Sequence, residues 1–352
     1  MVTIACIGAG NWGKNLIRNF SELPEARLKW ICDVNENRLR EMQRLYPSVR
    51  LTTRSEEIFR DPEVDGCIIA SSARTHYALA FDALSAKKHV FIEKPMTLNS
   101  GDARELITLA ATQDVRLMVG HLLLYHPAVQ KLQNLIQKKE LGDIFYIYSQ
   151  RVNLGQVRSD ENALWSFAPH DISVILYLLG ETPDNVSARG GSYLRSGIHD
   201  VVFVHMHFPD GKTAQIQLSW LDPHKERKLT IVGSQKMAVF DDMQPAEKIR
   251  VYDKGANIPK EYDSYGDAIT LRFGDIVIPR VNMTEPLKIE CQHFLDCIQQ
   301  SLDPISDGTN GLHVVRILEA AQISLEKNGV PVDLMPVEKG DISYVNIDTQ
   351  ER

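Results

Sequence analysis

The first 120 residues alternate short apolar runs with segments of helical periodicity, and this alternation constrains the fold more than any other feature. The runs are Val2–Ile7, Leu28–Cys32, Gly66–Ala70, His89–Ile92 and Leu117–Val119. Between them, apolar residues recur at the spacing of amphipathic helices. Continuously apolar strands must be covered on both faces. Residues 1–120 are therefore predicted to form an α/β domain with a doubly wound parallel sheet of the Rossmann type.

The pattern changes after residue 121. A helix is predicted to begin at Pro127 and to end near Leu141-Gly142, where a glycine is the expected stop. Longer runs then alternate polar and apolar residues, as strands with one less apolar face do, and they include Val201–Phe208 and Ala214–Trp220. Two late helices are expected at about Glu285–Ser301 and Gly311–Lys327. Residues 121–352 should thus form an α+β domain with a large, mostly antiparallel open sheet.

Composition narrows the class of partner and compartment. The net charge of −7 argues against a nucleic-acid partner, which calls for a basic patch. No apolar run approaches the ~20 residues of a membrane span, and the chain opens directly on a strand-like segment. The five cysteines form no CxxC pair and are interpreted as small apolar residues, which suits a cytoplasmic protein.

A glycine motif lies between the first predicted strand and the first predicted helix. Gly8-Ala9-Gly10-Asn11-Trp12-Gly13 fits GxGxxG, and this context makes the pattern a dinucleotide fingerprint. The first glycine permits a tight turn, and the second lets the backbone approach a pyrophosphate. Asp33 follows Gly13 by 20 residues and would bind the adenosine ribose hydroxyls. No arginine occurs in Val34-Asn35-Glu36, so NAD is favoured over NADP.

A charged pair follows the fourth of these apolar runs. His89–Ile92 delivers Glu93-Lys94-Pro95 to its carboxyl end, the edge where open parallel sheets bind ligands. A lysine partly desolvated beside a nicotinamide would have a lowered pKa and could share a proton with the reacting hydroxyl. Pro95 could follow a cis peptide bond. At a position away from the carboxyl end of a parallel strand, an exposed Glu-Lys pair would be interpreted as ordinary solvated surface.

These motifs together resemble the Gfo/Idh/MocA oxidoreductase family, over essentially the full chain. The matching residues are Gly8–Gly13, Asp33, Ala70–His76, Glu93-Lys94-Pro95, Gly120-His121, Tyr125-His126-Pro127 and His170 with Leu178 and Gly180. The resemblance implies hydride transfer between a nicotinamide and a sugar or polyol carbon, with Lys94 and His170 as catalytic residues. It implies NAD contacts from Gly8, Gly10, Asn11, Trp12, Gly13, Asp33, Ser71, Ser72, His76, Glu93, Lys94 and Trp165. It also implies a homodimer or homotetramer formed through the C-terminal sheet.

The segment around His170 departs from the family pattern. Many members carry Asp-x-Gly-x-His-x-x-Asp, whereas this chain has Ser166, Ala168 and Ser173 at the other three positions and adds Asp171. The missing aspartate argues against an inositol-type substrate. His170 can take a proton near neutral pH, provided that it and Lys94 lie within about 3 Å of one substrate oxygen. The alternative is a histidine that only caps or packs a helix.

Within the family, the chain looks most like the nucleotide-sugar 3-dehydrogenases, which oxidise C3 of a UDP-linked N-acetyl sugar ahead of an aminotransferase, as in lipopolysaccharide biosynthesis. Arginine forks and amides suit a polar, anionic substrate. The candidate substrate contacts are Lys94, Arg151, Asn153, Arg158, Asn162, Trp165 and His170.

Other functions stay open at this point. The enzyme could act on a free sugar, a polyol or a sugar phosphate, or the chain could be a regulator that binds a dinucleotide without turnover. His199, His205 and His207 have no carboxylate or cysteine partners at metal-ligand spacing, so no metal site is predicted. They are expected on the open sheet face, and Glu338–Arg352 is interpreted as a strand or an arm around a neighbouring subunit.

Overall fold

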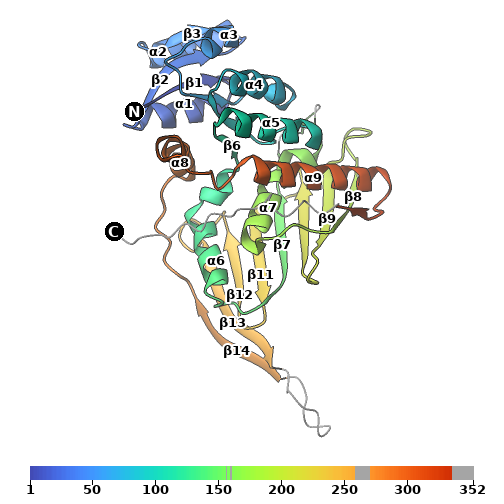
Figure 1. Cartoon of the computed structure of the whole chain (residues 1–352). Coiled ribbons are helices and arrows are strands. Elements are labelled where there is room, and N and C mark those ends of the chain that lie inside the picture. The colour runs from blue at the N-terminus through green and yellow to red at the C-terminus, as the bar shows by residue number, and fades with distance from the viewer. Residues whose placement is uncertain (156, 159–160, 258–269, 335–352) are drawn as a thin grey trace. The chain divides into compact units, whose positions relative to one another are not determined.

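The computed structural model describes residues 1–155, 157–158, 161–257 and 270–334, and this chain divides into two compact units (Figure 1). Of the described residues, the first unit comprises Met1–Tyr125 and Thr284–Arg316, and the second comprises 126–283, apart from the gaps, and 317–334. The predicted domain boundary at residue 120 therefore lies close to Tyr125, where the chain first passes from the first unit to the second. The later return of 284–316 to the first unit differs from the predicted division, because that return depends on contacts between residues far apart in the sequence.

The first unit contains a six-stranded parallel sheet, which confirms the predicted Rossmann architecture. The strands are β1 (Val2–Ile7), β2 (Ala26–Cys32), β3 (Arg50–Thr52), β4 (Gly66–Ile69), β5 (His89–Glu93) and β6 (Leu117–Gly120), in the order β3-β2-β1-β4-β5-β6. The order reverses between β1 and β4, and open α/β sheets bind ligands at such a point. Strand β3 has only three residues, too few to show a periodic signal.

Helices cover this sheet on both faces. They are α1 (Gly13–Glu22), α2 (Glu36–Leu45), α3 (Ser55–Phe59), α4 (Ala73–Ser85), α5 (Ser100–Gln113), the short η1 (Leu122–Tyr125), α8 (Pro286–Gln300) and the start of α9 (Gly308–Glu326). Phe20 of α1, Phe91 of β5 and Phe294 of α8 pack edge to face with ring centroids 5.8–6.4 Å apart. This apolar contact holds α8 on the sheet.

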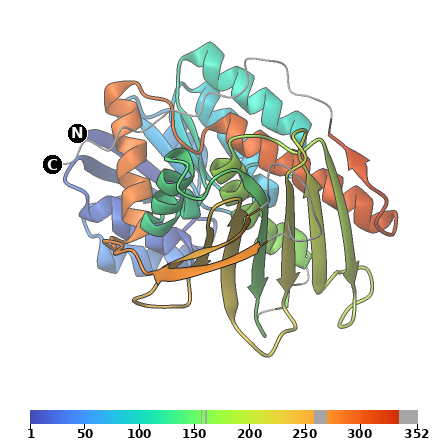
Figure 2. The ribbon, with the colours of Figure 1, turned by 90° about the horizontal axis from the view of Figure 1, so that it is seen from below.

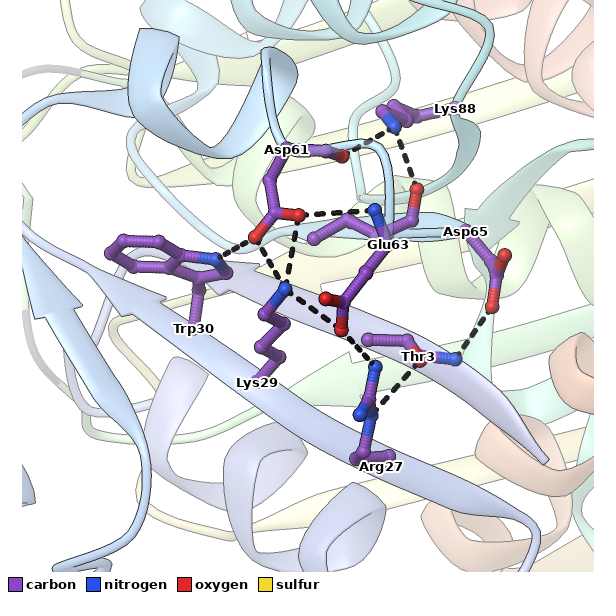
Figure 3. A network of polar contacts seen from close by, with 9 residues as sticks. Thr3, Arg27, Lys29, Trp30, Asp61, Glu63, Asp65 and Lys88 are labelled. Carbon is purple, nitrogen blue, oxygen red and sulfur yellow. Dashed lines mark hydrogen bonds and ion pairs between the residues drawn. The ribbon is translucent and has the colours of Figure 1, made fainter.

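Polar residues stabilise the amino-terminal edge of the same sheet (Figure 3). Lys88 is buried, and its ammonium donates to the carbonyls of Asp61 (2.8 Å) and Val64 (2.7 Å). Burial opposes ionisation of Asp61, but hydrogen bonds from Lys29 and Trp30 outweigh it and lower its pKa to about 2. This edge lies opposite the carboxyl ends of the strands, so the network fixes the scaffold and leaves the ligand edge clear.

The second unit contains a mixed, mostly antiparallel sheet, as predicted. Its strands among the described residues are β7 (Ile144–Val152), β8 (Asn185–Gly191), β9 (Val201–His207), β10 (Thr213–Ser219), β11 (Glu226–Gly233), β12 (Met237–Asp241), β13 (Ile249–Asn257), β14 (Thr270–Val277) and β15 (Val332–Asp333). Their order is β14-β13-β12-β11-β7-β10-β9-β8-β15, with only the β7–β10 pair parallel among these described strands (Figure 2).

Helices α6 (Pro127–Gln137) and α7 (Ala163–Leu179) lie on one face of this sheet (Figure 1). On β9 the buried residues alternate with exposed ones, and Phe203, His205 and His207 belong to the exposed set, as predicted. Helix α6 ends at Gln137, which corrects the expected end near Leu141-Gly142. The chain turns instead at Lys139, where φ is 56°.

The predicted arm at Glu338–Arg352 lies outside the described residues. None of the helices in the described part of the chain is both long and apolar enough to cross a membrane. All five cysteines are buried, as small apolar residues are expected to be.

Candidate active site

The glycine motif forms the turn between β1 and α1, and each glycine has a different reason to be there. Gly8 has φ of +103°, and a Cβ on it would lie 2.5 Å from the carbonyl oxygen of Ala70. A Cβ on Gly13 would lie 2.0 Å from the carbonyl oxygen of Gly8. A Cβ on Gly10 would meet only Arg38 Nη1, at 3.8 Å. The open side of the turn at Gly10 therefore fits a pyrophosphate at the start of α1.

Asp33 lies at the end of β2, beside this turn. It is buried, and its carboxylate accepts hydrogen bonds from the backbone N–H groups of Ala9 and Asn35, both at 2.8 Å. Arg38 Nη1 is 3.3 Å from Asp33 Oδ2. A carboxylate has about four acceptor positions, so Asp33 can still accept from ribose hydroxyls. The residues of this turn thus fit NAD, and Gly8, Gly10 and Asp33 are the residues that would hold it.

Arg38 was not predicted. It stands five residues after Asp33, beyond the three positions inspected for an arginine, and helix α2 carries it back toward the glycine turn. The signal that could have found it is the helical periodicity of the segment after Asp33, since a helix beginning at Glu36 turns residue 38 back toward the end of β2.

The loop after β4 supplies Ser71 and Ser72, and the first turn of α4 supplies His76. Ser72 is the residue before α4, and the hydroxyl of Ser71 is 2.8 Å from that of Thr75. His76 is buried, with Nδ1 2.8 Å from the carbonyl oxygen of Pro95 and Nε2 3.3 Å from that of Ser71. Burial lowers the pKa of His76. This imidazole therefore ties the loop after β4 to the segment after β5.

Glu93 and Lys94 lie where β5 ends. The Glu93 carboxylate accepts hydrogen bonds from the indole N–H of Trp12 and from the backbone N–H of Lys94. Burial raises the pKa of Glu93 to about 7, against the opposing effects of Trp12 and Lys94. The Lys94–Pro95 peptide bond is cis, as considered from the sequence. Glu93 thus connects the signature segment directly to the glycine turn.

In the second unit, α7 carries His170. The side chain of Asn162 caps this helix by accepting from the N–H of Trp165 (3.1 Å), and its amide donates to Gln322 (2.9 Å). Pro169 lies inside the helix and has no N–H, so it cannot bond the carbonyl four residues earlier. His170 is half-buried, one residue beyond this break.

The predicted substrate contacts of this unit have partners of their own. Arg151 of β7 forms a two-pronged ion pair with Asp171, at 2.5 Å and 3.4 Å, and both side chains are largely buried. Arg158 is exposed and 3.0 Å from Glu161. Asn153 is half-buried and follows the end of β7. The structure therefore gives Asn162 a capping role and Arg151 a bracing role that the sequence did not predict.

Two family models match the chain. The model described as an oxidoreductase family with an NAD-binding Rossmann fold covers residues 2–121, and the model of the GFO/IDH/MocA C-terminal domain covers residues 129–239. The chain belongs to the Gfo/Idh/MocA oxidoreductase family. It is an NAD-binding oxidoreductase of the sugar-dehydrogenase type, with the Rossmann fold and cofactor expected from its motifs.

Individual relatives are distant but nearly as long as this chain. The UDP-N-acetylglucosamine 3-dehydrogenase of Acidithiobacillus ferrooxidans is 25% identical, over 91% of this chain and 96% of its own. Its solved structure superposes with a TM-score of 0.77 at 23% identity, covering 92% of this chain and 98% of that one. The myo-inositol 2-dehydrogenase of Thermotoga maritima is 27% identical, over 72% of this chain and 79% of its own.

Proposed function

We propose that this protein oxidises a sugar hydroxyl to a ketone, at C3 of a UDP-linked N-acetyl sugar. The observation that carries the proposal is the connection of Lys94 to the glycine turn through Glu93 and Trp12. These bonds hold the backbone of Lys94 at the carboxyl edge of the sheet, next to the turn that fits the dinucleotide. An isolated nucleotide-binding scaffold has no need of a charged side chain there.

The proposed roles follow from ordinary acid–base chemistry. The substrate O–H gives its proton to the imidazole of His170, and the ammonium of Lys94 stabilises the developing negative charge on that oxygen. Bound NAD supplies the acceptor for the hydride that leaves the same carbon. The products are a ketone, NADH and one proton. Asp171, held by Arg151, fixes the turn of α7 that carries His170.

One observation supports a nucleotide sugar rather than an inositol. Ser166 occupies the position where many family members have an aspartate, so α7 offers no carboxylate there. The relative from Acidithiobacillus ferrooxidans, named for a UDP-sugar, is consistent with this substrate but does not discriminate, because an inositol dehydrogenase covers a similar share of the chain. Arg158 and Asn153 are the proposed contacts for the diphosphate and the acetamido group. A place ahead of a transamination, as in lipopolysaccharide biosynthesis, follows if the 3-keto sugar is the product.

The experiment is an absorbance assay at 340 nm with NAD and a substrate panel. UDP-N-acetylglucosamine and its uronate should give NADH, whereas glucose, glucose 6-phosphate and myo-inositol should give little. Lys94→Ala should abolish turnover and leave NAD affinity nearly intact. Turnover of myo-inositol alone would establish the polyol alternative, which the Thermotoga maritima relative favours. Binding of NAD with no turnover on any substrate would indicate a regulator.

We also propose self-association through the open face of the second unit. Exposed aromatic residues gather on its strands, among them Phe145, Tyr146 and Tyr148 of β7 and Phe203 of β9. Patches of this kind mark protein contacts. Light scattering should give a dimer or tetramer, and Tyr148→Glu combined with Phe203→Glu should give a monomer. A monomeric wild-type protein at micromolar concentration would refute this proposal.

A further inference from the structure

Arg38 lies beside two groups of the dinucleotide turn. It belongs to the first turn of α2, and its Nη1 is 3.3 Å from Oδ2 of Asp33. A Cβ built on Gly10 would lie 3.8 Å from the same nitrogen. The guanidinium is therefore next to the glycine that faces the pyrophosphate and next to the carboxylate that faces the adenosine ribose.

The acceptor positions of Asp33 are nearly all in use. Its Oδ2 accepts from the backbone N–H of Ala9 and from Arg38, and its Oδ1 accepts from the backbone N–H of Asn35. Since a carboxylate oxygen has about two acceptor positions, about one position remains, on Oδ1. The adenosine ribose of NAD presents two adjacent hydroxyl groups. Both can donate to Asp33 only if the guanidinium leaves Oδ2, so NAD competes with Arg38 for this oxygen.

The contact between Arg38 and Asp33 can be broken at little cost in free energy. Its length of 3.3 Å exceeds the value of about 2.7–2.9 Å that is typical of a charge-assisted hydrogen bond. The Arg38 side chain is 49% exposed, so water can solvate the separated guanidinium, and such ion pairs stabilise little. The Asp33 side chain is only 3% exposed and stays in place through its two backbone N–H bonds.

These properties make Arg38 suitable for a second anion. A 2′-phosphate on the ribose would replace a hydroxyl that donates to Asp33, so it would stand beside the carboxylate, where the guanidinium already lies. The planar fork of an arginine can bind a phosphate through two hydrogen bonds. Asp33 alone would repel this phosphate, and the positive charge of Arg38 offsets part of that repulsion.

We propose that Arg38 is a specificity-determining residue that binds a 2′-phosphate, so that this NAD-binding protein also accepts NADP, as a weaker second cofactor. With NAD, Arg38 leaves Oδ2 of Asp33 to the ribose hydroxyls. With NADP, Arg38 turns to the phosphate, and the remaining charge of Asp33 keeps NAD the tighter ligand. The lack of an arginine at positions 34–36 therefore does not exclude NADP, because α2 brings one back from position 38.

The first test is calorimetric titration of NAD and NADP with no sugar present, so its outcome is independent of the proposed substrate. Wild type should bind both, with NAD tighter. Arg38→Ala should weaken NADP binding by about tenfold or more, because a charge-assisted hydrogen bond is lost, and should change NAD binding by no more than about threefold. Arg40→Ala is the matched control, since Arg40 lies on the same helix and pairs with Glu36 at 3.3 Å, and it should change neither.

A second test uses a double variant, with thermal unfolding to check that each protein is folded. Asp33→Ser removes the repulsion and should tighten NADP binding, and Arg38→Ala added to it should remove most of that gain. Equal weakening of NAD and NADP by Arg38→Ala would overturn the inference, because it would assign the guanidinium to the pyrophosphate or the adenine that both cofactors share. A gain that survives the loss of Arg38, or no binding of millimolar NADP by wild type, would overturn it as well.

Discussion

Replacement of Glu290 by glutamine should make the protein progressively more stable than wild type as the pH rises. Glu290 lies on α8, is fully buried, and no hydrogen-bond partner for either carboxyl oxygen occurs in the described residues. Burial, with added repulsion from Glu93, raises its pKa well above 4.5. The folded protein therefore keeps this proton at pH values above 4.5 at which the unfolded chain has released it.

The sign and size follow from proton linkage. Above pH 4.5 the native state holds one more proton than the unfolded state, so each pH unit costs the wild type about 1.4 kcal/mol relative to the glutamine variant. Between pH 5 and pH 7 the difference should grow in favour of Glu290→Gln by up to about 3 kcal/mol, which is the most that one proton can contribute over two pH units. Any fixed free-energy cost of burying the glutamine amide is the same at pH 5 and at pH 7, so it does not affect the change between these two pH values.

The assay is urea unfolding of both proteins at pH 5, 6 and 7, followed by tryptophan fluorescence. Glu285→Gln, at the start of the same helix, is the control. The hydrogen bond from Arg18 lowers the pKa of Glu285, so this variant should show a small trend of opposite sign. A difference between Glu290→Gln and wild type that stays constant from pH 5 to pH 7 would refute the reasoning.

Three further sets of substitutions test the dinucleotide turn, the cofactor specificity and the ion pair beside His170. Gly13→Ala puts a methyl group 2.0 Å from the carbonyl oxygen of Gly8, so it should abolish NAD binding and lower the melting temperature. Gly10→Ala adds its methyl group in open space, so it should keep the melting temperature and weaken only NAD binding. Calorimetric titration and thermal unfolding measure these two effects, and equal behaviour of the two variants would count against the assigned roles. Asp33→Ser should reduce the ratio of NAD to NADP affinity, and an unaltered ratio would remove Asp33 from the specificity site. Asp171→Asn leaves the buried guanidinium of Arg151 without its carboxylate, so it should lower the free energy of unfolding in urea by roughly 3–5 kcal/mol. Adding Arg151→Met should recover much of that free energy, and additive losses in the double variant would contradict the pairing.

The sequence predicted the parts of the site that depend on local pattern. The glycine motif and the strand before Glu93 lie within short windows, so periodicity and spacing were sufficient to find them. Asp33 followed from its distance to Gly13. The prediction of Lys94 as a site residue required only the rule that ligands bind at the carboxyl ends of parallel strands.

The parts that were missed depend on residues brought together by the fold. Asn310 fixes His121 across 189 residues, and Glu290 reaches the region of Glu93 only because α8 packs on the sheet. Asn162 was grouped with substrate contacts because its amide is chemically suitable. Its use as a helix cap depends on where α7 begins, and element boundaries are the least certain part of a pattern-based prediction.

The return of residues 284–316 to the first unit has a consequence for synthesis on the ribosome. When the first 283 residues have emerged, the nucleotide-binding half still lacks α8, and the rings of Phe20 and Phe91 have no Phe294 to cover them. The nucleotide-binding unit must therefore wait with apolar surface exposed until nearly all of the other unit has been translated.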